Sequence, residues 1–421
     1  MDVSSSPQAG IGRKERDVRL DFFRGLAMFI IFMAHVPGNP WGRYIPARFG
    51  PSDATEIFVF CSGFASALAF GSVFVKRGFL LGTSRILFRA WQIYWAHICL
   101  FLVTATVVAM GTQYLGTKDY VGGLNLVRFF EEPAAGLAHL LTLTYVPNYF
   151  DILPMYFGVL LMIPVVMALS RVHSGWAIGF CLALWSVNMT FEFGLPAEWW
   201  SDRPWFFDPF GWQLIFFTGF AFASGWVKPP PPNKWLIGLA AAFVLFMIPM
   251  KFGPIWKNVD WIGDISDSLL WGFQKTDFGF LRWVHFLCLA YLVLCALHGR
   301  EAILRAQILK PIVKVGQQAL AVFVASMVLA RIAGMALDLI GREPLTFLLV
   351  HVSGFSTLIA VAFIAGYFRS APWRRRPDAP QLTVAPTSEP ERTEAPPLVT
   401  AAAAKEAPPL VASAGRRLHR R

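Results

Sequence analysis

Long apolar runs constrain this chain more than any other feature of its sequence. A helix needs roughly 20 apolar residues to cross about 30 Å of hydrocarbon, and ten segments approach this length. They lie at residues 22–36, 57–75, 91–110, 153–170, 176–193, 211–227, 235–252, 281–297, 319–339 and 345–367. Only 15% of the residues are charged, against about a quarter in soluble domains. We therefore expect an all-α polytopic membrane protein with about ten transmembrane helices, embedded in a lipid bilayer.

The distribution of Lys and Arg predicts the orientation of the chain. Most of these residues lie in one alternating set of loops and in the C-terminal segment. Loops rich in Lys and Arg face the cytoplasm, so both termini are expected there. The net charge of +11 is explained in this way, and no nucleic acid partner is expected. The apolar stretch at 134–149 is interrupted, and eleven spans are the alternative to ten.

Three parts of the chain differ in composition. Residues 1–20 form a basic N-terminal segment, which is expected to lie in the cytoplasm. Residues 21–370 hold all the apolar runs and form the predicted membrane domain. From residue 371 to residue 421 the composition turns to Pro, Ala, Thr and Glu. Such a segment cannot bury enough apolar area to fold, so it is expected to be a disordered cytoplasmic tail.

Several residues inside the apolar runs are expected to have structural roles. The five cysteines form no CxxC motif, so neither a disulfide framework nor a metal site is predicted. Gly63, Ala67 and Gly71 form a stripe of small residues that favours close packing of helices. Arg331 and Asp338 lie within the ninth apolar run, where a charged side chain is costly unless it is paired. We expect them to form a buried ion pair between helices.

The first apolar run places three ionisable residues on one helix. Arg24 and His35 are separated by about 1100° of helical rotation, roughly 20° more than three full turns, so they share a face. They lie roughly 16 Å apart along the axis, and Asp21 can pair with Arg24. This face is expected to line a cavity enclosed by protein. The alternative is that Arg24 anchors the helix at the membrane edge and His35 is a polar residue at its end.

Three further carboxylates and two basic residues are candidates on the outer side. Asp53 and Glu56 have the spacing of a helix capping box, and either could also orient His35. Asp151 lies at an outer boundary, where a carboxylate needs a partner. Arg282 and His285 share a face at the start of the eighth run and are candidates for contact with substrate.

Arg24 and His35 have ten residues between them, and this pair resembles the R-x10-H motif of the acyltransferase family 3 membrane enzymes. Residues 57–64 resemble the FFVLSGF segment of that superfamily. More closely, the chain resembles the OpgC family, whose members succinylate osmoregulated periplasmic glucans. The resemblance runs from about residue 16 to residue 376, and its motifs lie at residues 21–25, 35–40, 52–56, 151–156, 211–213, 281–287 and 316–318. The last of these reads Gly-Gln-Gln where relatives are expected to have Gly-Arg-Gln, which puts a basic contact in doubt.

The resemblance implies a role for each of these residues. The donor would be a cytoplasmic acyl-CoA such as succinyl-CoA, the acceptor a periplasmic glucan, and the location the bacterial inner membrane. No permanently bound cofactor and no metal is implied. His35, Asp53 and Glu56 are then the catalytic candidates. His35 would act as the general base, which we favour, or would carry the acyl group transiently. The candidates for binding acyl-CoA are Arg24, Arg85 and Arg89, and those for contact with substrate or cavity are Asp21, Asn39, Asp151, Arg282 and His285.

Other functions remain open at this point. Arg85 and Arg89 could equally be simple positive anchors at the inner end of the third run. An acetyltransferase that acts on a different surface glycan would keep the same chemistry with another donor and acceptor. A membrane transporter would use the ionisable residues as a proton relay or substrate path. Inverted repeats and paired broken helices would favour transport, and the sequence shows neither clearly.

Overall fold

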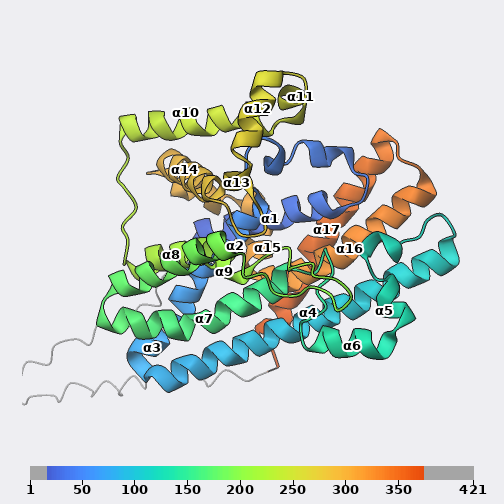
Figure 1. The fold of residues 1–421 in the computed structure, drawn as a ribbon, viewed down its shortest axis with the longest axis horizontal. Coiled ribbons are helices and arrows are strands. Elements are labelled where there is room, and N and C mark those ends of the chain that lie inside the picture. The colour runs from blue at the N-terminus through green and yellow to red at the C-terminus, as the bar shows by residue number, and fades with distance from the viewer. Residues whose placement is uncertain (1–16, 374–421) are drawn as a thin grey trace, which may run out of the picture. The chain divides into compact units, whose positions relative to one another are not determined.

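The structure is a computed structural model that describes residues 17–373. These residues form helices joined by turns and loops, and no β-strand occurs among them (Figure 1). Residues up to Pro372 belong to one compact unit. The predicted basic segment and the predicted disordered tail lie outside the described residues, apart from residues 17–20 and 371–373.

The first half of the unit contains eight α-helices and four short helical turns of other kinds. The α-helices are α1 (Val18–His35), α2 (Ala54–Ser66), α3 (Ser72–Arg77), α4 (Phe79–Leu115), α5 (Val127–Glu131), α6 (Pro133–Leu141), α7 (Ile152–Val172) and α8 (Ser174–Phe191). Short 3-10 turns are η1 (Pro40–Arg43), η2 (Pro46–Arg48) and η4 (Gly122–Leu124), and a π-helical turn, η3 (Ala67–Gly71), joins α2 to α3.

The second half continues with longer helices and several short ones. They are α9 (Pro209–Ser224), α10 (Lys234–Lys251), α11 (Gly253–Trp256), α12 (Asp260–Ser268), α13 (Leu270–Phe273), α14 (Phe280–Leu297), α15 (Lys310–Gln317), α16 (Ala319–Ile340) and α17 (Pro344–Arg369), with the 3-10 turns η5 (Glu301–Arg305) and η6 (Gln307–Leu309) before α15.

Each of the ten predicted apolar runs overlaps a helix of the structure. Among the described residues, seven helical segments are long and apolar enough to cross a membrane. They are Ala54–Arg77, Phe79–Leu115, Ile152–Val172, Lys234–Lys251, Phe280–Leu297, Ala319–Ile340 and Pro344–Arg369. Helix α1 carries three charged side chains in 18 residues, and α9 has only 16 residues. A membrane protein is thus indicated, while the number of ten spans and the cytoplasmic side of the termini stay predictions.

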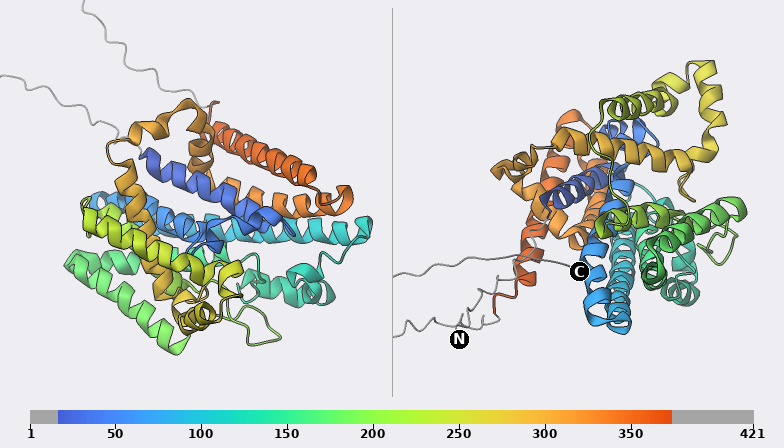
Figure 2. Two further views of the ribbon diagram at one scale, coloured as in Figure 1. Left: turned by 90° about the horizontal axis from the view of Figure 1, so that it is seen from above. Right: turned by 90° about the vertical axis from the view of Figure 1, so that its left-hand side faces the viewer.

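Helix α1 is central to the packing of this unit. It contacts α2, α15, α16 and α17, and Figure 2 shows it in dark blue beside the orange and red helices. Two glycines permit the approach of α15. A Cβ atom built on Gly25 would lie 2.0 Å from the carbonyl oxygen of Ile312, and one on Gly316 only 1.7 Å from that of Asp21. The backbones therefore touch where α1 crosses α15, which fixes the position of α1.

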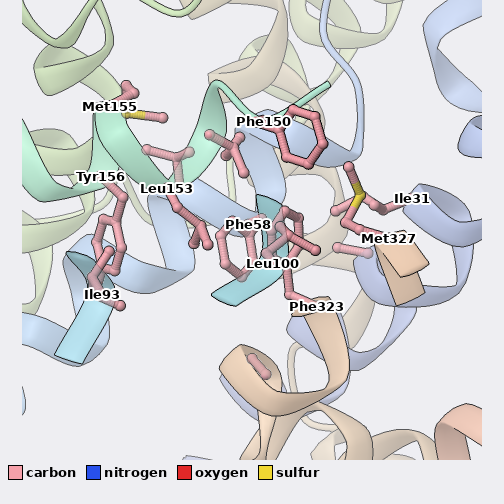
Figure 3. Packing of buried hydrophobic residues seen from close by; sticks show 14 of the residues in the cluster. Ile31, Phe58, Ile93, Leu100, Phe150, Leu153, Met155, Tyr156, Phe323 and Met327 are labelled. Carbon is pink, nitrogen blue, oxygen red and sulfur yellow. The ribbon is translucent and has the colours of Figure 1, made fainter. Parts of the chain in front are cut away.

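Aromatic and aliphatic side chains fill the space between α1, α2, α4, α7, α9 and α16. Figure 3 shows part of this core, where Phe58 of α2 stacks on Phe323 of α16 at 5.9 Å between ring centroids. The predicted close packing at Gly63 is confirmed, because a Cβ atom there would lie 1.9 Å from the carbonyl oxygen of Phe216 in α9. Gly71 has no such neighbour, so the stripe of small residues acts only in part. A smaller, separate core joins α10 to the turns that follow it, with Met247, Met250, Ile262 and Phe273 buried in it.

Candidate active site at the end of helix α1

His35 is the last residue of α1, and a hydrogen bond fixes its imidazole ring. Its Nδ1 atom lies 2.7 Å from the carbonyl oxygen of Ile31, one turn earlier. A carbonyl oxygen can only accept, so Nδ1 carries the proton in the neutral ring. The other nitrogen, Nε2, is then left with a free lone pair. Neutral imidazole in this tautomer can accept a proton at Nε2, as a general base must.

A cavity of about 370 Å³ opens beside His35. Its wall is formed by the end of α1, by the loop that follows and by one residue of α16, namely Ala34, His35, Val36, Pro37, Gly38, Asn39, Gly42, Arg43, Ile45, Arg48 and Arg331. We call this space the His35 cavity. Arg24 and Asp21 do not line it.

Asn39 shapes the loop that forms the outer wall of the His35 cavity. Its side-chain nitrogen donates to the carbonyl oxygen of Met33 at 2.8 Å and lies 2.9 Å from Nε2 of His351 in α17. Its side-chain oxygen accepts from the backbone N–H of Trp41 at 3.0 Å. The Trp41 ring also packs on the His351 ring, with 4.5 Å between centroids. Asn39 therefore holds the loop against α1 and α17, as well as lining the cavity.

Tyr149 and Arg331 form the side of the site that faces α16. The Tyr149 and His35 rings form a T-shaped pair, with 5.4 Å between centroids and 74° between planes. The Arg331 guanidinium lies 3.8 Å from the centroid of the same Tyr149 ring. The Tyr149 hydroxyl donates to the carbonyl oxygen of Met327, one turn before Arg331 in α16. One tyrosine thus lies between the candidate base and a guanidinium.

Asp53 and Glu56 form the predicted capping box at the start of α2, which is confirmed. Asp53 accepts from the backbone N–H of Thr55 at 2.7 Å, and Glu56 accepts from the backbone N–H of Asp53 at 2.7 Å. Neither carboxylate forms a hydrogen bond with His35 among the described residues. The proton on Nδ1 is donated to the Ile31 carbonyl, and Nε2 of the neutral ring has no proton to donate to a carboxylate. Asp53 acts on His35 only through its field, as do Lys275 and Arg331.

Two basic residues that lie 222 and 226 positions later in the sequence pair with these carboxylates. Nε of Arg282 donates to Glu56 at 2.8 Å, and Nζ of Lys275 lies 2.6 Å from Asp53. Nη2 of Arg282 also contacts Glu56 and lies 3.8 Å from Asp53. Glu56 is fully buried and Arg282 is 5% exposed. We call Asp53, Glu56, Lys275 and Arg282 the ion-pair network. Burial alone would raise the pKa of Asp53, but Lys275 and Arg282 hold it well below its ordinary value.

His285 adjoins the ion-pair network but not the His35 cavity. Its Nδ1 lies 2.7 Å from the hydroxyl of Ser52, and both residues are 3% exposed. Its Nε2 is buried with no hydrogen-bond partner among residues 17–373. Gly50 packs directly on the ring, since a Cβ atom there would lie 2.5 Å from Nε2. His285 does not line the His35 cavity, and its contact with substrate stays a prediction.

The residues predicted to bind acyl-CoA lie away from the His35 cavity. Arg24 is half-buried in the second turn of α1. Arg85 is exposed near the start of α4 and lies 5.6 Å from the ring centroid of Phe70. Arg89, one turn later, donates to the side chain of Gln92 at 3.0 Å. Asp21 is 1% exposed at the crossing of α1 and α15. The structure therefore leaves their predicted roles open.

Asp151 is buried at the start of α7, two residues after Tyr149. It is 2% exposed, and it accepts from the backbone N–H of Phe206 at 3.3 Å. Burial raises the pKa of its carboxyl to about 7, although that hydrogen bond and the charge of Arg203 oppose the shift. Asp151 therefore fastens the 206 loop to the segment that carries Tyr149, and it lies outside the cavity lining.

The predicted buried ion pair of Arg331 and Asp338 is wrong. Asp338 pairs instead with Lys118 at 2.6 Å and with Arg342 at 2.7 Å, at the end of α16. Arg331 contacts an aromatic ring rather than a carboxylate, because Tyr149 occupies the space beside it. An arginine inside an apolar run was a signal for a functional site, whereas nothing in the sequence pointed to Tyr149, Lys275 or His351. Within residues 17–373 no cluster of His, Cys, Asp or Glu could hold a metal ion.

The chain was compared with protein families, curated proteins and solved structures. A family model described as OpgC protein matches residues 16–370, which include α1, the His35 cavity and the ion-pair network. Comparison with curated proteins and with solved structures gives no match. The matched region covers most of the 421 residues, and the chain belongs to the OpgC family.

Proposed function

We propose that this protein moves a succinyl group, or another short acyl group, from cytoplasmic acyl-CoA to a periplasmic glucan or related polysaccharide. Membership of the OpgC family indicates a role in modifying osmoregulated periplasmic glucans and a transferase activity. The acyl donor, the succinyl group, the inner-membrane location and a place in the acyltransferase family 3 superfamily are parts of the proposal. The R-x10-H spacing of Arg24 and His35 supports that superfamily.

The observation that carries the proposal is the state of His35 at its cavity. Its Nδ1–H is held by the Ile31 carbonyl, and the cavity lies against the same side chain. In the proposed reaction Nε2 takes the proton of a sugar hydroxyl while that oxygen attacks the thioester carbonyl carbon. The new ester bond forms, the C–S bond to CoA breaks, and the CoA sulfur leaves as a thiolate that recovers the proton. The charge on His35 is therefore transient.

Arg24 supports the proposal on the donor side. It shares the face of α1 with His35 but lies roughly 16 Å along the helix axis from it, so an extended donor could reach from one to the other. A guanidinium binds phosphate oxygens through paired hydrogen bonds. We assign Arg24 to the CoA portion of the donor, and Arg85 and Arg89 at the start of α4 to its phosphates.

The remaining candidates act at a distance from the reacting atoms. Asp53 and Glu56 fix the start of α2 and couple it to α14 through Arg282. His285 supports the same junction through Ser52. Asn39 and Asp151 hold the two loops that border the site. We therefore propose that these residues position the site, and that His35 alone among them exchanges a proton with substrate.

Mass spectrometry of periplasmic glycans tests the proposal. Cells that lack the protein should lose an acyl substituent, and expression of the wild-type chain should restore it. His35→Ala should restore none while reaching the membrane in normal amount. Arg128→Gln, at an exposed residue of α5 whose ion pairs within residues 17–373 are with neighbouring Glu131 and Glu132, is the control and should restore it fully. An unchanged acyl complement in the absence of the protein would refute the proposal.

Two other results of this experiment would redirect the assignment. Loss of acetyl groups from a different surface glycan would identify an acetyltransferase with the same site. Unchanged acylation, together with a solute gradient that depends on His35, would identify a transporter.

A further inference from the structure

The His35 cavity has a marked excess of positive charge. Arg43, Arg48 and Arg331 all contribute to its wall, and the described residues that line it include no Asp or Glu. Arg43 and Arg48 are exposed at the rim, while Arg331 reaches in from α16. None of the three forms an ion pair with a carboxylate within residues 17–373, whereas Lys275 nearby is neutralised by Asp53 at 2.6 Å. The cavity is therefore built to receive an anionic group.

Arg331 is the arginine whose position is most tightly determined. Its guanidinium lies over the Tyr149 ring at 3.8 Å, and its Nε atom is buried with no hydrogen-bond partner among the described residues. A buried donor without a partner is costly unless a ligand supplies the acceptor. Stacking on an aromatic ring leaves the edge of a guanidinium available for a bidentate contact with a carboxylate.

Tyr149 is held in place at a cost in backbone energy. Its φ angle is +97°, in the region that side chains other than glycine rarely adopt. Such strain persists where the surroundings determine it, commonly at functional sites. Here the hydroxyl of Tyr149 is bound to the Met327 carbonyl of α16, and its ring separates His35 from Arg331. The strained residue thus sets the spacing between the base and the guanidinium.

The guanidinium of Arg331 needs an acceptor for its buried N–H group. One of the two substrates of the proposed reaction should therefore carry an anionic group close to His35. A sugar hydroxyl and a thioester carbonyl are both neutral, so neither would neutralise three guanidiniums in the ground state. The far end of a short dicarboxylic acyl group carries a carboxylate a few bonds from the reacting carbonyl. This group could reach Arg331 while its thioester lies at His35.

Building on the proposed function, we propose that Arg331 is a specificity-determining residue. It binds the free carboxylate of the acyl group, with Tyr149 as the positioning residue and Arg43 and Arg48 as supporting charges at the rim. The site therefore favours a short acyl chain that ends in a carboxylate over an uncharged chain of similar length.

The full-length protein in membranes, supplied separately with succinyl-CoA and acetyl-CoA and a neutral glucan, tests this assignment. The quantity measured is the ratio of kcat/KM for the two donors. Arg331→Gln should lower the succinyl-to-acetyl ratio about ten- to hundredfold, the range for one lost hydrogen bond to a charged group. Arg331→Lys should keep part of the preference because it keeps the charge. Arg128→Gln should leave the ratio unchanged.

Two outcomes would overturn the assignment even though the enzyme acylates glucan. An unchanged ratio in Arg331→Gln would show that Arg331 does not choose the donor. An equal loss with both donors would show that it stabilises the reacting carbonyl or the fold instead. If Arg331→Gln fails to fold, Arg43→Gln at the exposed rim is measured in its place. The assignment requires this variant to lower the succinyl-to-acetyl ratio by a smaller factor, and an unchanged ratio would overturn it. A wild-type protein that uses neither donor would refute the proposed function itself, and the assignment with it.

Discussion

The His35 cavity and the ion-pair network lie on neighbouring parts of the molecule and treat charge in opposite ways. In the network, two carboxylates meet two basic side chains at 2.6–2.8 Å, and Glu56 is fully buried. In the cavity, three arginines and His35 contribute to the wall, with no carboxylate among the described lining residues. Paired buried charges stabilise one arrangement of helices. Charged groups that line a cavity without an ion-pair partner are available to bind a ligand. We therefore assign the chemistry to the His35 cavity.

The two regions also differ in the groups that hold their side chains in place. The network joins α2 to α14 by side chains whose hydrogen-bonding groups are mostly used within the protein. The His35 cavity fixes its groups through backbone carbonyls, those of Ile31 and Met327, which leave the functional edges of His35 and Arg331 unused. A functional site needs rigid groups with free bonding capacity. Substitutions in the two regions should therefore differ in what they damage.

The largest expected effect is on activity at His35. His35→Gln removes the base but keeps a polar side chain of similar reach, so acyl transfer should fall about 10²- to 10⁴-fold. The thermal unfolding midpoint in detergent should change little, because the ring is only half-buried and forms one hydrogen bond. A loss of transfer with an unchanged unfolding midpoint would show that His35 acts in the reaction. A large drop in the midpoint would show that His35 stabilises the fold instead.

The next effect is on stability at Glu56. Glu56→Gln removes the carboxylate that is hydrogen-bonded to the buried Arg282 and leaves only Asp53, at 3.8 Å, near its charge. This should lower the free energy of unfolding by about 3–5 kcal/mol. Thermal unfolding of the purified protein in detergent measures it. The double variant Glu56→Gln with Arg282→Gln should recover part of the loss, because the unpaired charge is gone. Activity per folded molecule should stay close to that of the wild type. Loss of transfer in a folded Glu56→Gln protein would show that the two regions are coupled catalytically.

The helices of both regions could be predicted from the sequence, because burial in lipid or in a core leaves a contiguous apolar run. All ten predicted runs overlap helices of the structure. The capping box of Asp53 and Glu56 was predictable for the same reason, since its partners lie three residues apart. The extent of α4, with 37 residues against the 20 predicted, was not. Its amphipathic ends extend past the apolar run, and composition cannot mark where they stop.

The candidate site was predictable only where its geometry is local. The spacing of Arg24 and His35 within one helix identified the face and the candidate base. The partners of that face come from distant segments: Arg282 meets Glu56 across 226 positions, and Tyr149 meets Arg331 through packing of α16. No periodicity encodes such contacts. The predicted ion pair of Arg331 failed because the pairing of a buried charge depends on the neighbour that folding supplies.

Two glycines allow a matched test of packing in the two regions. A Cβ atom on Gly50 would lie 2.3 Å from Cε1 of His285, beside the ion-pair network, whereas one on Gly42 in the cavity wall would meet nothing within 4 Å. Gly50→Ala should lower the free energy of unfolding by about 1–3 kcal/mol, because the buried ring must shift. Gly42→Ala should change it by less than about 0.5 kcal/mol. Chemical denaturation in detergent measures both, and equal losses would show that the cavity wall is packed as tightly as the network.

The smallest effect concerns the pH dependence of stability, where two carboxylates at helix starts differ. Asp53 is held ionised by its basic partners, so its contribution stays constant near neutral pH. The pKa of Asp151 is raised by burial to about 7, against about 3.9 in the unfolded chain. The folded state therefore binds the extra proton between these values, and stability should fall as pH rises from 5 toward 7, by at most about 1.4 kcal/mol per pH unit.

Asp151→Asn isolates this contribution. The amide oxygen can still accept from the Phe206 N–H, but it cannot ionise, so the fall between pH 5 and 7 should flatten and the variant should be the more stable protein above pH 7. Unfolding midpoints recorded across this range measure the difference, with Asp53→Asn as the matched control. Because Asp53 pairs with Lys275, that control should lower stability at every pH without changing the slope. If Asp151→Asn does not change the dependence of stability on pH, Asp151 is already ionised in the folded protein. The charge of Asp151 would then be compensated by its surroundings, as the charge of Asp53 is in the ion-pair network.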